Sequence, residues 1–159
     1  MRFGIAVLLA CALAGTGCGG DSGSAAGDSS TPASPSGSSS NQGLEGTWLA
    51  TSAVFTSASN PAKRTDIVAQ GTAVKLELTT TGFALSYTDS GQAPKVTNGT
   101  WSSTKDVLLL KPAGVSWSWE FDMNQSGNSL SLSGASVEFD FAANGVNEQA
   151  KLSMALVRQ

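Results

Sequence analysis

The chain has 159 residues, with 9 basic and 12 acidic side chains, no histidine and 2 cysteines. This weakly acidic charge, without any run of lysine or arginine, argues against nucleic acid and anionic membrane surfaces as partners. The lack of histidine excludes Ser-His-Asp and Cys-His catalysis, and both cysteines stand among the first 18 residues. We therefore expect no enzyme activity, no cofactor and no metal site built from imidazole or thiolate.

The first 17 residues have the layout of a secretory signal peptide. Arg2 precedes an apolar stretch, Phe3 to Ala14, that is shorter than the roughly 20 residues of a membrane-spanning helix. Three small residues then precede Cys18, and this arrangement resembles the lipobox of bacterial lipoproteins. Cys11, in "LLAC", matches that motif better letter by letter, but it would leave an apolar core of only about five residues, against about 7–15 in signal peptides.

The resemblance implies that Cys18 is lipidated and becomes the first residue of the mature protein. The acyl chains would then anchor the protein in the lipid bilayer of a bacterial cell envelope, with the outer membrane or cell surface favoured over the inner membrane. Of the 25 residues from Gly19 to Gly43, 15 are Gly or Ser. Such a segment buries too little apolar surface to fold, so residues 18–43 are predicted to form the lipidated end and a disordered tether.

Residues 44–159 are long enough for one domain and too short for two. Apolar and polar residues alternate along "VSWSWEFDM" (Val115 to Met123), which is typical of a half-buried strand. Short alternating segments separated by Gly, Pro and Asn predict an all-β domain, an antiparallel up-and-down β-barrel of 8–9 strands, with a sandwich as the alternative. The candidate strands cover residues 46–54, 74–78, 83–87, 95–103, 106–111, 115–123, 129–134, 137–141 and 150–158.

One connection is much longer than a hairpin loop of 2–5 residues. It runs from Phe55 to Gln70, and long connections are often lids or binding segments. We expect a helical turn within it, around Lys63 to Val68.

The domain opens with "LEGTWLATSA" and continues as a single up-and-down run of strands, and in this it resembles the lipocalin-like (calycin) barrels of small bacterial lipoproteins. In lipocalins a Gly-x-Trp motif on the first strand places a tryptophan as a plug in the closed end of the barrel. A basic residue of the last strand packs across the ring. The resemblance assigns Gly46, Trp48 and Arg158 to this plug.

A candidate ligand site follows from the same alternation. Trp117, Trp119, Phe121 and Met123 share one face of the predicted strand, which would point into the barrel. Phe55 and Ile67, from the long connection, would cover an open end. Two functions remain open: a monomeric, membrane-tethered barrel that binds a small apolar or amphipathic molecule, or a structural or interaction protein of the envelope with a filled barrel.

Four carboxylates form the other candidate cluster. Glu120 and Asp122, and again Glu138 and Asp140, lie two residues apart on one strand face. Brought together they could hold a hard cation or act as an acid pair. Alternation already requires polar residues opposite Trp119 and Phe139, so we expect a solvated outer face.

Overall fold

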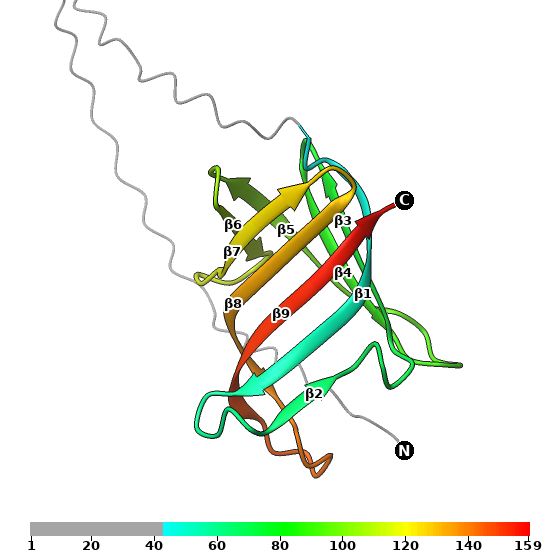
Figure 1. Cartoon of the computed structure of the whole chain (residues 1–159), viewed down its shortest axis with the longest axis vertical. Coiled ribbons are helices and arrows are strands. Elements are labelled where there is room, and N and C mark those ends of the chain that lie inside the picture. Colours follow the sequence, from blue (N-terminus) through cyan, green and yellow to red (C-terminus); the bar gives the residue numbers. More distant parts are fainter. Residues whose placement is uncertain (1–42) are drawn as a thin grey trace, which may run out of the picture. The chain divides into compact units, whose positions relative to one another are not determined.

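The computed structural model describes residues 43–159 and consists there entirely of β-strands, turns and loops (Figure 1). Neighbouring strands are antiparallel, and pairing between the first and last of them closes an eight-stranded barrel, with β2 as an additional short strand beside β1. The predicted fold class is confirmed. The strands are β1 (Gly46–Ser57), β2 (Arg64–Asp66), β3 (Ala73–Thr79), β4 (Gly82–Thr88), β5 (Lys95–Ser103), β6 (Val107–Pro112), β7 (Trp119–Ser126), β8 (Ser129–Phe139) and β9 (Glu148–Arg158).

Several predictions concern residues 1–42 and lie outside the described part of the chain: the signal peptide, Cys11, Cys18 and nearly all of the tether. Between residues 43 and 159 no helix has the length and apolarity to cross a membrane.

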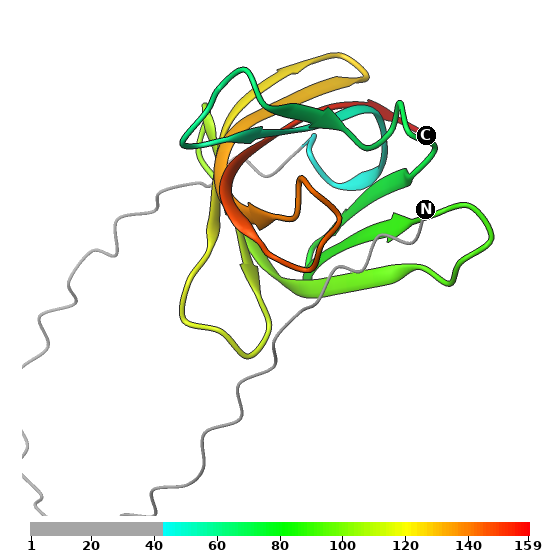
Figure 2. The ribbon, with the colours of Figure 1, turned by 90° about the horizontal axis from the view of Figure 1, so that it is seen from below.

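Alternation along each strand explains how the barrel is filled. In β3, Val74, Leu76 and Leu78 are buried, and the residues between them are more exposed. The strands curve around a common interior (Figure 2). The same alternation in the other strands turns a row of apolar side chains towards this interior, where they form one continuous core.

Strand β8 joins two segments that the sequence pattern separates. Its inward residues are even-numbered up to Leu132 and odd-numbered from Ala135 to Phe139. The change of phase is a β-bulge, because the register against β9 shifts between Leu132 and Ala135. Gly134 lies in this bulge with a φ of 91°, a conformation that favours glycine. The bulge bends one long strand where we expected two short ones.

The predicted strand from Val115 to Met123 is only partly right. Strand β7 begins at Trp119, where its pairing with β6 ends opposite Leu110, and residues 113–118 form the connection between the two strands. Trp117 therefore does not point into the barrel: it is 51% exposed and its ring lies 5.5 Å from that of Trp119. The expectation that it faces inward is wrong.

The connection between Phe55 and Gln70 is a hairpin where we expected a helical turn. Strand β1 continues to Ser57, and β2 returns along it with Phe55 opposite Thr65. The predicted turn around Lys63 to Val68 is wrong, since the first part of that range is strand β2 and the rest is a hydrogen-bonded turn.

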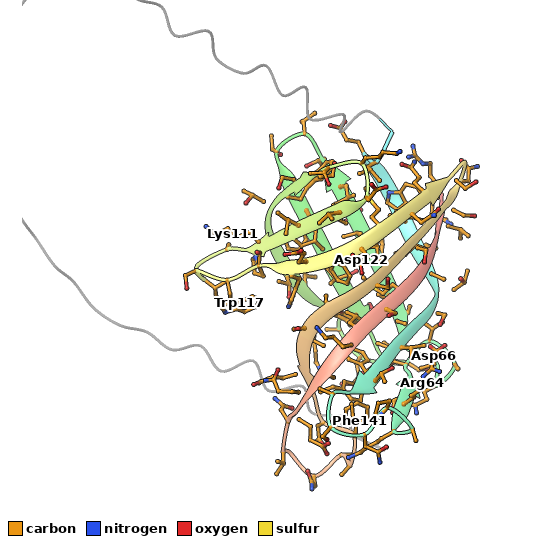
Figure 3. All side chains as sticks on the ribbon, turned by 60° about the vertical axis from the view of Figure 1, so that its left-hand side comes forward. Arg64, Asp66, Lys111, Trp117, Asp122 and Phe141 are labelled. Atoms are coloured by element: carbon orange, nitrogen blue, oxygen red, sulfur yellow. The ribbon has the colours of Figure 1, made fainter. Side chains whose placement is uncertain are left out.

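The carboxylate of Asp66 holds this hairpin against the barrel (Figure 3). Oδ2 accepts a hydrogen bond of 2.7 Å from Ser52 Oγ, and Oδ1 accepts bonds from the backbone N–H groups of Ala53, Val68 and Ala69 at 3.1, 3.0 and 3.3 Å. Partial burial raises the pKa of Asp66, but these four hydrogen bonds outweigh it and hold the pKa below its usual value of 3.8.

We expect Asp66→Asn to destabilise the barrel by about 1–2 kcal/mol at neutral pH, because the amide replaces one of the accepting oxygens with a donor. The pKa of Asp66 is lower in the folded chain, so its stabilisation is present above about pH 4 and is lost as the pH falls through the folded value. Thermal melts of both proteins from pH 7 to pH 2 test this: the difference in stability should shrink at the acidic end. A constant difference would show that the charge of Asp66 is unimportant. Asp122→Asn, on the exposed face of β7, serves as a carboxylate control.

Candidate functional site

The end of the barrel where β1 begins is closed. Trp48 is completely buried there, and its Nε1 donates a hydrogen bond of 2.8 Å to the carbonyl of Leu44. The Arg158 guanidinium, from the end of β9, lies over the indole with its Cζ 4.5 Å from the ring centroid. A cation in this position is attracted to the face of the ring, by about 0.5–2 kcal/mol.

The chain that enters this end is bound to it. Arg158 Nη2 donates to the carbonyl of Gly43, and Gln125 Nε2 donates to the same oxygen at 2.8 Å. Gly43 was expected to belong to the disordered tether, yet it is held by two side chains, and Leu44 beside it is 2% exposed. Gly46 has a φ of 138°, a conformation that favours glycine, and a Cβ there would meet Arg158 Nη1 at an ordinary contact distance of 3.7 Å.

The barrel interior is filled by side chains. A side chain that lined a cavity large enough for a ligand would keep surface accessible to a water molecule. The central residues keep almost no accessible surface. Each is at most 2% exposed, and they are Trp48, Leu76, Leu78, Leu85, Leu108, Leu110, Phe121, Leu130, Leu132, Leu152, Met154 and Leu156.

The six predicted ligand-binding residues do not gather around one cavity. Phe121 is fully buried and Met123 is 9% exposed, both within the packed core. Trp119 is half-buried, with its ring centroid 6.5 Å from that of Phe83. Trp117 stands outside, on the connection between β6 and β7 (Figure 3).

The remaining two predicted ligand residues, Phe55 and Ile67, are 6% and 7% exposed. Phe55 stacks on Phe139 with ring centroids 4.1 Å apart, and Phe139 meets Phe141 edge-on at 4.9 Å. These contacts fasten the β1–β2 hairpin to the end of β8.

An ion pair beside these rings was not predicted from the sequence. Lys63 Nζ lies 2.5 Å from Glu148 Oε1 and 5.0 Å from the centroid of the Phe141 ring. No short sequence pattern indicates this contact, because Lys63 and Glu148 are 85 residues apart in the chain. Together with the aromatic stack, it ties the β1–β2 hairpin to the β8–β9 connection.

Two hollows in the described part of the chain open on the outer surface. One, of about 470 Å³, lies where β5 meets the start of the β6–β7 connection, between Gly99, Thr100 and residues 111–116. The other, of about 200 Å³, lies on the outer face of β7, β8 and β9 around Asn124, Ser131 and Ala155. Neither is enclosed by the barrel.

The four predicted carboxylates lie along the outer face and edge of β7 and β8. Glu120, Asp122 and Glu138 are exposed, and Asp140 is half-buried. Slight desolvation raises the pKa of Asp140, but hydrogen bonds from backbone N–H groups, Gly145 first among them, lower it overall. Among residues 43–159 no three acidic side chains are grouped closely enough to hold a metal ion.

The fold and these contacts define the chain as a closed antiparallel β-barrel with a packed interior. No protein-family model, curated protein or solved structure matches the chain.

Proposed function

We propose that this protein is a lipid-anchored lipoprotein of the bacterial cell envelope whose barrel acts through its outer surface, as an interaction module, and carries no ligand inside. The observation that carries the proposal is the packed core, with its central side chains 0–2% exposed. An eight-stranded barrel is either just filled by side chains or holds one small ligand, and such packing supports the first case.

The proposed anchor rests on the sequence. An apolar stretch followed by small residues and Cys18 resembles a lipobox, and a Gly/Ser tether then separates Cys18 from the barrel. A flexible chain of that length has an end-to-end distance of roughly 25–30 Å, enough to hold the barrel clear of lipid headgroups.

The plug of Gly46, Trp48 and Arg158 supports a lipocalin-like origin for the barrel. A shared fold does not bring ligand binding with it, because function depends on the site. In this barrel the interior residues that would line a ligand cavity are packed against one another.

Two measurements on the full chain expressed in a bacterium test the proposal. The protein should partition into detergent, and Cys18→Ser should move it to the aqueous phase, whereas Cys11→Ser should still partition into detergent. Titration with fatty acids and apolar dyes up to about 100 µM should leave the tryptophan fluorescence unchanged. Detergent partitioning of Cys18→Ser would contradict the anchor, and saturable quenching that Phe121→Leu abolishes would contradict the filled barrel.

A further inference from the structure

The lower half of β8 forms an edge of the sheet. Pairing between β7 and β8 ends at Asp122 opposite Ser133, and the bulge at Gly134 then bends β8 away. From Ala135 to Phe139, the strand pairs with β9 on one side, and among the described strands it has no partner on the other. Five residues of strand therefore face a gap below the β6–β7 connection (Figure 3).

The register shows which backbone groups point into this gap. Glu138 lies opposite Gln149, whose carbonyl points away from β8 and accepts a hydrogen bond from Ala58 N. In an antiparallel ladder both residues of such a pair direct their backbone groups outward. The N–H and C=O of Glu138 therefore point away from β9, as do those of Ser136 two residues earlier, and they can pair with another strand.

Natural sheets usually block such edges with proline, charged side chains (lysine above all), a β-bulge or a very short strand. Residues 135–139, "ASVEF", contain neither proline nor lysine. The bulge lies at the upper end of the segment and leaves the five residues below it extended. An added strand would hydrogen-bond to them in the way that peptides extend a sheet in other proteins.

The charge around the edge indicates what kind of strand fits. Glu120, Asp122 and Glu138 are exposed there, and a Cβ on Gly134 would lie 3.5 Å from Asp122 Oδ2, which places that carboxylate over the upper end of the edge. The nearby cation, Lys151, donates to Ser136 Oγ at 2.7 Å. The ion pairs of the described residues, Lys63–Glu148 and Lys75–Glu77, do not involve these three carboxylates.

Apolar surface lies on the other side of the same edge. Val137 is half-buried, and Trp117 extends 51% exposed from the connection above the gap. A strand with alternating side chains would place basic residues over the carboxylates and apolar residues towards Val137 and Trp117.

We propose that the free edge of β8, residues 135–139, binds an extended polypeptide segment with alternating basic and apolar residues as an added strand. This inference rests on the proposed role as an interaction module, and it specifies the class of partner.

The test uses the ¹⁵N-labelled full chain and the peptide Lys-Val-Lys-Val-Lys-Val-Lys. The expected result is saturable shifts of the Ser136 and Glu138 amide signals and slower hydrogen exchange of both. Glu138→Pro removes an N–H that the β9 ladder does not use, so the chain should fold and bind the peptide at least about tenfold more weakly. Glu138→Gln keeps that N–H and should weaken binding only about two- to threefold, an effect that added salt should reduce.

Several results would overturn the inference. They are the absence of shifts at Ser136 and Glu138 up to millimolar peptide, equal binding of Glu-Val-Glu-Val-Glu-Val-Glu, or unchanged affinity in Glu138→Pro. Ser136→Pro replaces Glu138→Pro if that variant does not fold. Self-association that either proline variant abolishes would identify a second copy of the chain as the occupant and would also reject the proposed partner. None of these readouts depends on Cys18 or on the apolar dyes, so the inference can fail while the proposed function stands.

Discussion

Replacing Trp48 by alanine should destabilise the barrel by about 3–5 kcal/mol, the usual effect of emptying a large aromatic site. The indole is completely buried at the closed end, and its N–H bonds to the carbonyl of Leu44. Its removal would leave a void and an unpaired carbonyl, and would uncover the guanidinium of Arg158, which lies over the ring. Chemical denaturation of the two proteins measures the difference directly.

Arg158→Ala is the matched control for the other half of this contact, and it should destabilise the barrel by only about 0.5–2 kcal/mol. Trp48→Phe should lie between the two, because the benzyl ring refills part of the volume without the N–H. A loss below about 1 kcal/mol for Trp48→Ala would mean that the closed end does not depend on its plug.

The up-and-down order of the strands along the chain could be predicted because each strand is short and amphipathic. Residues 95–103 were predicted as a strand with the bounds that β5 has. Six further strands were found to within four residues at each end, since apolar residues alternate wherever one face is buried, whereas β8 was predicted as two segments and β2 was missed. The pairing of β1 with β9 closes this row into a barrel, in place of the sandwich that the pattern also allowed.

The errors fall where alternation and pairing differ. Residues 115–118 alternate as strongly as residues 119–123, but a strand also needs a neighbour, and the pairing with β6 stops at Trp119 opposite Leu110. Trp117 is exposed for this reason. Conversely, the break of phase at Gly134 looked like a strand end, although it is a bulge in a continuous strand. Alternation predicts which side chains would share a face of a strand. It does not predict whether a partner strand is present.

The candidate site was predicted less well than the fold for the same reason. A row of apolar side chains facing inward is compatible with a cavity and with a filled core, and the choice depends on side-chain volumes across the whole barrel. The contacts that close the two ends, between Gln125 and Gly43 and between Lys63 and Glu148, join residues more than 80 positions apart. No local pattern in the sequence marks them.

The repeated tripeptide "GTW" shows how much depends on context. Gly46-Thr47-Trp48 and Gly99-Thr100-Trp101 both lie in strands, and both indoles donate to a backbone carbonyl, that of Leu44 at 2.8 Å and that of Thr79 at 2.7 Å. The glycines differ. Gly46 has a φ of 138° beside Arg158, whereas Gly99 lies where two strands approach closely.

Gly99→Ala should destabilise the barrel by about 3 kcal/mol or more, because the new methyl group has no space. Its Cβ would lie 2.0 Å from the carbonyl oxygen of Lys111 and 2.7 Å from Cε1 of Phe83. A ring can turn aside, but the carbonyl belongs to β6, which pairs with β5 at this position, so the two strands would have to separate. Thr100→Ala is the control, because Thr100 follows Gly99 in β5 and its side chain is exposed. This change should alter the stability by no more than about 0.5 kcal/mol.

The double variant Phe83→Leu/Gly99→Ala separates the two contacts. If the carbonyl of Lys111 is the obstacle, the smaller side chain at position 83 should give no rescue, and the two losses should add to within about 0.5 kcal/mol. Denaturation of the two single variants, the double variant and the parent chain gives this coupling energy. A rescue of about 1 kcal/mol or more would show that the ring of Phe83, and not the spacing of β5 and β6, makes glycine necessary at this position.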